Sequence, residues 1–178
     1  MRKIAIIGCS GSGKSTLAHV IGRKLNIDPI DLDTVRFTDG FTSEKRPYDD
    51  FMKDIANIAD SKEWIVEGVY YNQKYHIEDV LWKNADMVIW LDIPLWLIEY
   101  RTWKRSIIRI FKHQTKPSGS PVNWKTEFGK DGLLRVLHKI HAATHEHYPN
   151  LLDKINKDTQ IIHIKNRADL KKLLININ

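Results

Sequence analysis

The sequence is poor in the features that mark secreted, membrane-spanning and repetitive proteins. Cys9 is the only cysteine, which excludes a disulfide framework, agrees with a reducing compartment and leaves either a turn-filling or a redox role for this side chain. No apolar run approaches the roughly 18 residues that a membrane-spanning helix needs, and the N-terminus has no signal-peptide layout. Internal repeats and low-complexity tracts are absent as well. We therefore expect a soluble, cytoplasmic protein with no membrane partner.

The charge is moderately basic and unevenly distributed along the chain. Among the 178 residues, 28 are Lys or Arg and 22 are Asp or Glu, which gives a formal net charge of +6. Such an excess fits either a nucleic-acid surface or an entrance for polyanionic nucleotides. Residues 101–116 contain several cations and no acid, which favours the second interpretation. The length suits one α/β domain that spans residues 1–178.

One motif organises the chain. Residues 8–15, Gly-Cys-Ser-Gly-Ser-Gly-Lys-Ser, match the phosphate-binding pattern G-x-x-x-x-G-K-[ST] at every fixed position. Gly8, Gly11 and Gly13 allow successive backbone N–H groups to point inward around an anion. In this pattern Lys14 reaches the β- and γ-phosphates of a nucleotide, and the Ser15 hydroxyl is a ligand of Mg²⁺. The sequence therefore predicts nucleotide-phosphate binding.

Apolar periodicity predicts alternating strands and helices. Short apolar runs bounded by turn residues are typical of buried strands, and apolar residues that recur every three or four positions are typical of helices. The expected strands cover residues 4–7, 29–33, 64–69, 87–91 and 161–164. The expected helices cover residues 14–25, 47–60, 94–111, 131–148 and 168–174. This order predicts a three-layer α/β fold of the P-loop NTPase type, in which helices flank a five-stranded parallel sheet and a small lid is attached.

Carboxylates lie at or just after the carboxyl ends of three of the expected strands, at the edge of the sheet where open α/β proteins bind ligands. Asp33 is placed to meet an acceptor hydroxyl or a Mg²⁺-bound water, although Asp31 and Asp33 as caps of the following turn are an alternative. Glu67 is placed to hold the hydration shell of Mg²⁺, with a structural ion pair as the alternative. Asp92 precedes a proline and is interpreted as a helix cap.

Two segments are candidates for substrate-binding lobes. Residues 34–60 lie between the second and third strands, where an acceptor-binding segment would be inserted. Residues 112–130 contain Pro, Ser and Gly without an apolar stripe, which predicts a mobile lid loop. Arg101, Arg105 and Arg109 precede this loop on one edge of a helix. They are interpreted as groups that surround a triphosphate, with a solvated surface as the alternative.

Histidines are concentrated in the helix expected at residues 131–148, which Pro149 is expected to end. His138, His141 and His145 fall on neighbouring turns, as metal ligands do. No H-E-x-x-H or carboxylate partner pattern accompanies them. We interpret them as a solvated helix face.

The ordered motifs resemble those of the adenylate-kinase-like small P-loop kinases. These motifs are the phosphate loop, a D-x-D strand end, an E-G strand end, L-D-x-P and an R-x-x-x-R helix. The chain is more closely similar to the bacterial group known as DNA topology modulation proteins, whose members carry G-S-x-G-S-G-K-S-T, H-L-D, W-I-[IV]-[DE]-G-x-Y and W-L-D-x-P at similar positions. The resemblance covers nearly the whole chain. Its first motif is specific for phosphate binding, and the others gain force through order and spacing.

The resemblance implies roles for individual residues. The implied nucleotide-binding set is Gly8, Ser10, Gly11, Ser12, Gly13, Lys14, Ser15, Thr16, Arg101, Asn166 and Arg167. Within it, Arg101 and the neighbouring Arg105 stand at the start of the lid, and Asn166 and Arg167 border the adenine ring. Asp33 and Arg36 have the D-x-x-R spacing of the segment that meets the acceptor nucleotide in adenylate kinases. Residues 67–71, Glu-Gly-Val-Tyr-Tyr, lack the arginine with which those enzymes grip the acceptor's phosphate.

The residues and the resemblance together predict an ATP-dependent, Mg²⁺-assisted kinase that acts on a nucleotide, a nucleoside or another small molecule. The candidate catalytic residues are Lys14, Asp33, Arg101 and Arg105, and the candidate metal ligands are Ser15 and Glu67. The cations would neutralise charge on the transferring group, while Asp33 orients or deprotonates the acceptor. The alternative is a non-enzymatic or slowly hydrolysing nucleotide-dependent switch that contacts DNA through its basic lid. Steep salt dependence of DNA retention would distinguish that switch from a kinase.

Overall fold

The structure is a computed structural model that describes residues 2–37, 45–68, 77–112, 123–124, 127 and 133–177. Its strands are β1 (Lys3–Gly8), β2 (Pro29–Asp31), β3 (Trp64–Glu67), β4 (Met87–Leu91) and β5 (Gln160–Ile164). Its helices are α1 (Lys14–Leu25), α2 (Leu32–Arg36), α3 (Tyr48–Asp60), α4 (Ile77–Val80), the 3₁₀ helix η1 (Trp82–Asn84), α5 (Leu95–Phe111), α7 (Leu133–Leu152) and α8 (Arg167–Asn176).

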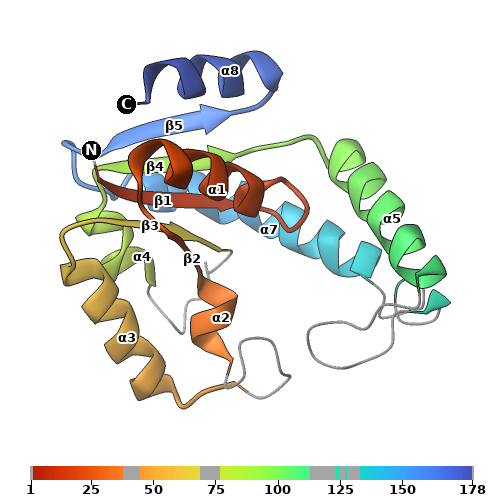
Figure 1. Ribbon diagram of the computed structural model, residues 1–178, viewed down its shortest axis with the longest axis horizontal. Coiled ribbons are helices and arrows are strands. Elements are labelled where there is room, and N and C mark those ends of the chain that lie inside the picture. The colour runs from red at the N-terminus through yellow and green to blue at the C-terminus, as the bar shows by residue number, and fades with distance from the viewer. Residues whose placement is uncertain are drawn as a thin grey trace.

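The five strands form one parallel sheet in the order β2-β3-β1-β4-β5. Their carboxyl ends point the same way, toward the side on which β4 leads into α5 (Figure 1). The register brings Asp31 level with Glu67, and Gly8 level with Leu91. The prediction of a three-layer α/β fold with a five-stranded parallel sheet is therefore confirmed.

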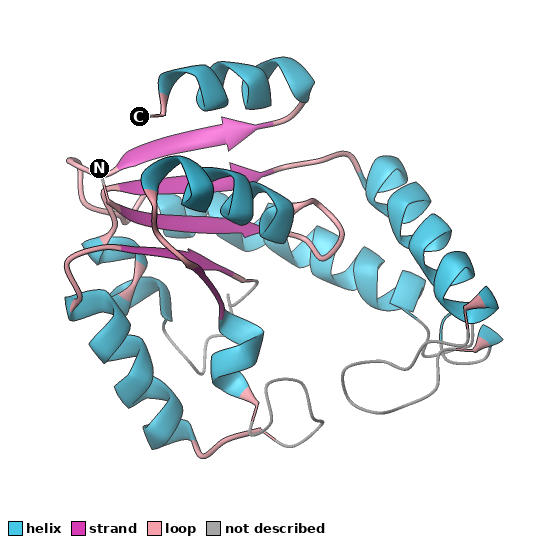
Figure 2. Cartoon of the chain, in the orientation of Figure 1, coloured by secondary structure: helices cyan, strands magenta, loops and turns pink. Residues whose placement is uncertain are grey.

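Alternating side chains of the strands build a core on each face of the sheet. In β1, Ile4 and Ile6 belong to one apolar cluster, and Ala5 and Ile7 belong to the other. Helices α1 and α8 cover the first face, whereas α3, α4 and the end of α7 cover the second (Figure 2). Burial on both faces explains why these strands are continuous apolar runs.

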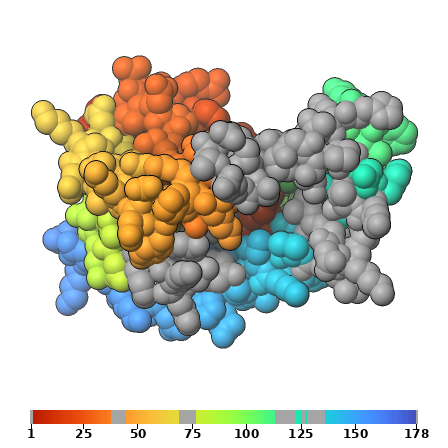
Figure 3. All heavy atoms as spheres, turned by 90° about the horizontal axis from the view of Figure 1, so that it is seen from below, coloured from red at the N-terminus to blue at the C-terminus, as the bar shows by residue number. Residues whose placement is uncertain are grey.

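Viewed as spheres from below, the α3 residues (orange) and the α7 residues (cyan) lie on the face turned to the viewer (Figure 3).

Within the parts of the chain that the structure describes, no helix combines the length and apolarity needed to cross a membrane.

The end of α7 corrects one expectation from the sequence. The helix continues through Pro149 to Leu152, although Pro149 was expected to end it. Tyr148 and Leu152 are buried in the core, and the Asp153 N–H donates to the Pro149 carbonyl at 3.0 Å. Burial of these side chains therefore stabilises the last turn, although Pro149 has no N–H and the helix loses one backbone hydrogen bond there.

Candidate functional site

The loop between β1 and α1 contains glycines whose backbone angles are unfavourable for other residues. Gly11 and Gly13 have φ angles of 83° and 107°, in the left-handed region that residues with a Cβ rarely adopt. A Cβ on Gly11 would lie 2.7 Å from the Thr102 hydroxyl of α5. Gly13 directly precedes α1, so the N-terminus of a helix with its unpaired N–H groups opens into the loop. This geometry suits an anion.

Lys14 is the buried cation of the loop. Its Nζ donates to the Cys9 carbonyl at 3.3 Å, so the side chain lies back over the loop. Burial lowers the pKa of Lys14, and the negative charge of Glu67 acts against that shift. A desolvated ammonium gains more from a phosphate than a hydrated one, because less water must be removed when the anion arrives.

Cys9 itself is buried, and burial raises the pKa of its thiol although Lys14 lies nearby. A raised pKa leaves little thiolate at neutral pH, which favours the turn-filling interpretation over the redox one.

Ser15 and Glu67 meet next to Lys14. The Ser15 hydroxyl donates to the Glu67 carboxylate, so the two candidate Mg²⁺ ligands come from different elements and share one location. Burial raises the pKa of Glu67, and Ser15 and Lys14 act in the opposite direction. Across the described residues, no cluster of three or more His, Cys, Asp or Glu side chains forms a metal cage. Hydroxyl and carboxylate oxygens beside a phosphate loop fit Mg²⁺, which binds few protein ligands and retains water.

Asp33 lies in a helix and not at a strand end, which corrects the sequence prediction. Strand β2 stops at Asp31, whose side chain accepts a hydrogen bond from the Asp33 N–H at 2.9 Å and caps α2. The cap interpretation is thus correct for Asp31, and burial raises the pKa of that carboxyl group. Asp33 is exposed in the first turn of α2, and it lines the same cleft as Asp31.

The three arginines of α5 separate into two groups. Arg101 donates from Nη1 to the Ser12 carbonyl at 3.1 Å, which ties α5 to the phosphate loop. Arg101 and Arg105 line the cleft, whereas Arg109 does not. The predicted basic edge therefore presents two of its three arginines to the cleft.

The lid prediction falls largely outside the described residues. In the segment 112–130, the structure describes only Lys112, Asn123, Trp124 and Glu127. Trp124 and Glu127 are helical, so the expected irregular loop contains some helix. Glu127 is 2% exposed and accepts a hydrogen bond from the Ser106 hydroxyl of α5 at 2.5 Å. Residues 38–44 of the acceptor segment and the departure at 69–71 also lie outside the described residues.

Asn166 and Arg167 line the other end of the cleft, after β5. The Asn166 side chain caps α8: its Oδ1 accepts the N–H groups of Ala168 and Asp169 at 2.8 and 3.0 Å. The Asp169 carboxylate in turn accepts a hydrogen bond from the Asn166 N–H, which completes a capping box. Asn166 therefore shapes this wall of the cleft through the backbone.

Thr102 was missed by the sequence reasoning. Its hydroxyl and that of Ser12 are buried beside the phosphate loop, and neither makes a hydrogen bond among the described residues. The missed signal was a stripe of Ile98, Thr102 and Ser106, which puts small polar side chains on the buried face of α5. Unsatisfied buried hydroxyls are rare in proteins and often mark a position that meets a ligand or water.

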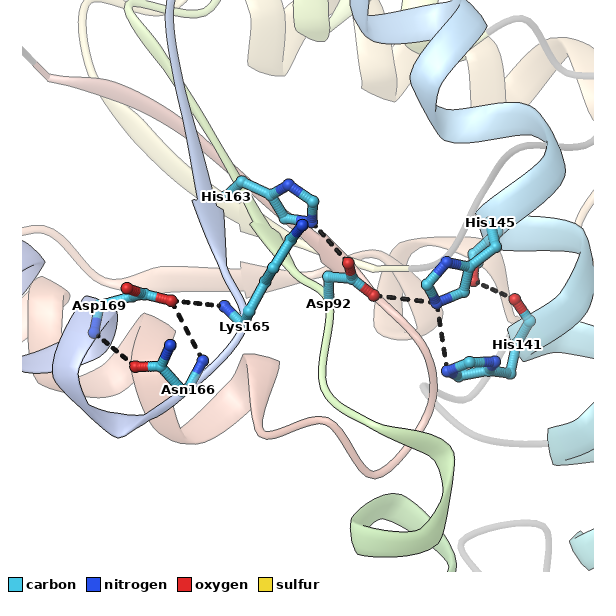
Figure 4. A network of polar contacts seen from close by, with 8 residues as sticks. Asp92, His141, His145, His163, Lys165, Asn166 and Asp169 are labelled. Carbon is cyan, nitrogen blue, oxygen red and sulfur yellow. Dashed lines mark hydrogen bonds and ion pairs between the residues drawn. The ribbon is translucent and has the colours of Figure 1, made fainter.

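Asp92 and two of the histidines form a network that corrects the interpretation of Asp92 as a helix cap (Figure 4). Asp92 does not cap α5, which begins after Pro94 without a side-chain cap. Its carboxylate oxygens instead contact His145 of α7 at 2.9 Å and His163 of β5 at 2.6 Å. His145 also lies 3.2 Å from His141, whose pKa is lowered by burial and by that neighbouring imidazole. His138 and His145 are exposed, as predicted for a solvated helix face, and the network adds contacts from that face to the end of β4 and to β5.

The phosphate loop, the carboxylates of the β2–β3 side, the α5 residues Arg101, Thr102 and Arg105, and the start of α8 surround one cleft of about 870 Å³ at the carboxyl edge of the sheet. Its polar lining, within the described part of the chain, includes Ser10, Ser12, Lys14, Ser15, Thr16, Asp31, Asp33, Glu67, Arg101, Thr102, Arg105, Lys165, Asn166 and Arg167. The cleft therefore brings together the predicted site residues of five different elements and their connecting loops. Gly8 stands apart from the lining, at the end of β1.

The sheet order and the glycine-rich loop between β1 and α1 define a P-loop fold. The chain is similar to the solved structure of a sugar kinase from Janibacter sp. HTCC2649, with 18% identity, a TM-score of 0.56, and 98% of this chain and 93% of that one covered. It is also similar to shikimate kinase from Bacteroides thetaiotaomicron, with 17% identity, a TM-score of 0.54, and coverage of 98% and 94%.

A shikimate kinase from Acinetobacter baumannii, solved in complex with shikimate, has 15% identity, a TM-score of 0.59, and coverage of 99% and 90%. No protein-family model matches the chain, and no curated protein matches it. At these identities the similarity shows the fold alone. The closer resemblance to the DNA topology modulation group stays a prediction.

Proposed function

We propose that the protein is a P-loop kinase that transfers the γ-phosphoryl group of ATP to a small acceptor. The observation that carries this proposal is the position of Lys14, a desolvated ammonium that lies inside the glycine-rich loop and next to the Ser15–Glu67 pair. The named substrates of the structural neighbours, shikimate and a sugar, support a small hydroxyl-bearing acceptor as well.

The proposed chemistry relies on position and charge. The loop N–H groups and Lys14 would bind the β- and γ-phosphates, and Arg101 and Arg105 would reach the transferring group from α5. Ser15 and Glu67 would hold Mg²⁺, which neutralises phosphate charge when bound. Asp33 would orient the acceptor hydroxyl and take its proton. We propose further that Asn166 and Arg167 border the adenine, with Ser10, Ser12 and Thr16 on the phosphates.

Replacement of Lys14 tests the proposal. We expect Lys14→Ala to abolish ATP turnover and to weaken ATP binding at least about tenfold, which corresponds to about 1.4 kcal/mol. The fold should persist, because the substitution removes a buried charge and leaves the apolar core intact. Calorimetric titration with Mg²⁺-ATP and measurement of ADP release check the two effects, while circular dichroism checks the fold.

The matched control is Arg23→Ala, which removes an exposed cation from the same helix. It should leave ATP binding and turnover unchanged. Turnover by Lys14→Ala at the wild-type rate would refute the assignment of the phosphate loop.

A further inference from the structure

Two hydroxyl groups are buried at the phosphate loop without a partner. Thr102 of α5 is 2% exposed, and Ser12 of the loop is 4% exposed. Neither the Thr102 Oγ1 nor the Ser12 Oγ has a hydrogen-bond partner among the residues that the structure describes. A buried hydroxyl without a partner costs free energy, and few such groups persist in native proteins. Each of them therefore gains stability from any state of the protein that supplies a partner.

The Thr102 hydroxyl lies against the backbone of Gly11. A Cβ on Gly11 would be 2.7 Å from the Thr102 Oγ1 and 3.3 Å from Cγ2 of Ile98, one turn earlier in α5. Because Gly11 has no side chain, α5 packs directly on the loop at this point. The residue before Thr102, Arg101, forms a hydrogen bond there, from its Nη1 to the Ser12 carbonyl at 3.1 Å. Helix α5 therefore contacts the loop through two consecutive residues.

A phosphate in the loop would change what the loop backbone offers to α5. The N–H and C=O of a planar trans peptide group point in opposite directions, so an N–H that turns inward around an anion turns the carbonyl of the same peptide group outward. The two peptide groups that flank the Gly11 Cα carry the carbonyls of Ser10 and Gly11. The Thr102 Oγ1 is shielded from solvent although Thr102 lines the cleft, so this hydroxyl faces the loop and not the open cleft. Phosphate binding can thus supply the acceptor that the Thr102 hydroxyl lacks.

Resting on the proposed function, we propose that Thr102 is a positioning residue for the triphosphate. In the free protein its hydroxyl is unpaired within the described part of the chain, and with phosphate in the loop it donates to a loop carbonyl beside Gly11. This hydrogen bond stabilises the occupied loop. It also fixes α5, whose Arg101 and Arg105 line the cleft, relative to the bound phosphates. Thr102 acts through the loop backbone and does not touch the reacting atoms.

Two substitutions of Thr102 test this role. Thr102→Val keeps the shape of the side chain and removes the hydroxyl, so it should not lower the unfolding temperature of the free protein. It should weaken binding of Mg²⁺-ATP about threefold to tenfold in calorimetric titrations, because the occupied loop loses one hydrogen bond. Thr102→Ser retains the hydroxyl and should bind ATP as tightly as wild type.

Ser106→Ala is the matched control, because it removes the next hydroxyl on the same face of α5. The Ser106 hydroxyl already donates to the buried Glu127 carboxylate at 2.5 Å, and Ser106 is not part of the cleft lining. This substitution should therefore lower the unfolding temperature of the free protein and leave ATP affinity unchanged. The two residues are expected to show opposite patterns, with a loss of affinity for Thr102→Val and a loss of stability for Ser106→Ala.

Inorganic triphosphate locates the effect, since it can occupy the loop without a nucleoside. Thr102→Val should weaken its binding by the same factor as that of ATP. Unchanged ATP affinity in Thr102→Val would overturn the inference, as would a lower unfolding temperature of the free variant or an equal loss of affinity in Thr102→Ser. A loss confined to ATP would place the effect at the nucleoside and would overturn it as well. Failure of the wild-type protein to bind ATP would instead refute the proposed function.

Discussion

Lys14 and Arg101 hold the phosphate loop by the same kind of contact. Lys14 donates to the Cys9 carbonyl at 3.3 Å, and Arg101 donates to the Ser12 carbonyl at 3.1 Å. Both carbonyls are uncharged acceptors, whereas a phosphate adds the attraction between opposite charges to the hydrogen bond. A bound triphosphate would therefore compete for both side chains. Arg101 would then transmit the occupancy of the loop to α5.

Arg105 and Arg109 allow a catalytic effect to be separated from surface charge. Arg105 lines the cleft one turn beyond Arg101, and Arg109 lies outside the lining. We expect Arg105→Ala to lower kcat by up to about 10³-fold, or about 4 kcal/mol, with a much smaller change in the Kd for ATP, because a cation brought in from α5 meets the charge that develops during transfer. Single-turnover kinetics and direct titration of ATP measure the two quantities.

Arg109→Ala is the matched control on the same helix and should leave both quantities close to wild type. Equal losses of kcat and affinity in Arg105→Ala would make Arg105 a ground-state binding residue. Equal effects of the two substitutions would assign the result to general surface charge.

At the level of elements, α8 forms one wall of the cleft through its N-terminus. Asp169 accepts hydrogen bonds from the N–H groups of Lys165 and Asn166 at 2.9 and 3.2 Å, and Asn166 caps the first turn. Lys165, Asn166 and Arg167 all line the cleft. The capping box therefore determines where this wall stands relative to β5.

Two substitutions of Asn166 distinguish its role as a helix cap from a direct contact with the nucleotide. Asn166→Ala should lower the free energy of unfolding by about 1 kcal/mol, because two N–H groups of the first turn lose their acceptor. Asn166→Asp retains an acceptor at the cap and should keep both stability and ATP affinity. Urea unfolding and ATP titration check these outcomes. Loss of ATP affinity in Asn166→Asp at unchanged stability would indicate that the amide itself contacts the nucleotide.

Across the whole molecule, the two edges of the sheet have different tasks. The side chains that line the cleft gather at the carboxyl edge, whereas Asp86 joins three strands at the amino edge. Its Oδ2 accepts the N–H groups of Arg2 and Lys3 at 2.6 and 3.0 Å, and its carbonyl accepts the Gln160 N–H at 2.9 Å. Slight burial raises the pKa of Asp86, but the hydrogen bonds from Arg2 and Lys3 outweigh it, so the net shift is downward.

This shift predicts a pH dependence of stability. A carboxyl group whose pKa is lower in the folded than in the unfolded protein stabilises the fold above its unfolded pKa, and this contribution is lost as the pH falls through the folded pKa. Asp86→Asn should therefore lower the free energy of unfolding at pH 7 by up to about 1 kcal/mol, since solvent screens this exposed group. The difference from wild type should shrink as the pH falls below about 4.

Urea unfolding of the wild type and of Asp86→Asn between pH 3 and pH 7 measures the difference in the free energy of unfolding. The raised pKa values of Asp31 and Glu67 change stability with pH in the opposite direction. Both proteins contain these two residues, so their contributions cancel in the difference. ATP affinity at pH 7 should be unchanged, because Asp86 lies at the edge away from the cleft. A difference that stays constant with pH would contradict the role assigned to the Asp86 charge.

Local pattern alone was sufficient for the parts of the chain whose cause is local. The bounds of α1, Lys14–Leu25, and of β4, Met87–Leu91, are those predicted, because an amphipathic period and a short apolar run bounded by turns specify these elements. The glycine spacing of residues 8–15 predicted the conformation of the loop for the same reason. In addition to these local features, only the order of the strands in the sheet was needed to place the loop and the carboxylates at the same edge.

Tertiary structure decided the features that depend on partners distant in the sequence. Pro149 remains inside α7 because Tyr148 and Leu152 are buried, and Asp92 meets His145 and His163 instead of capping its own helix. Arg36 has the spacing of an acceptor-binding residue, yet Phe51 and the Arg46 carbonyl hold it in the packing of α2 against α3. A cation takes the partners that the fold brings within reach, and residue spacing specifies only those within a few turns of the same chain.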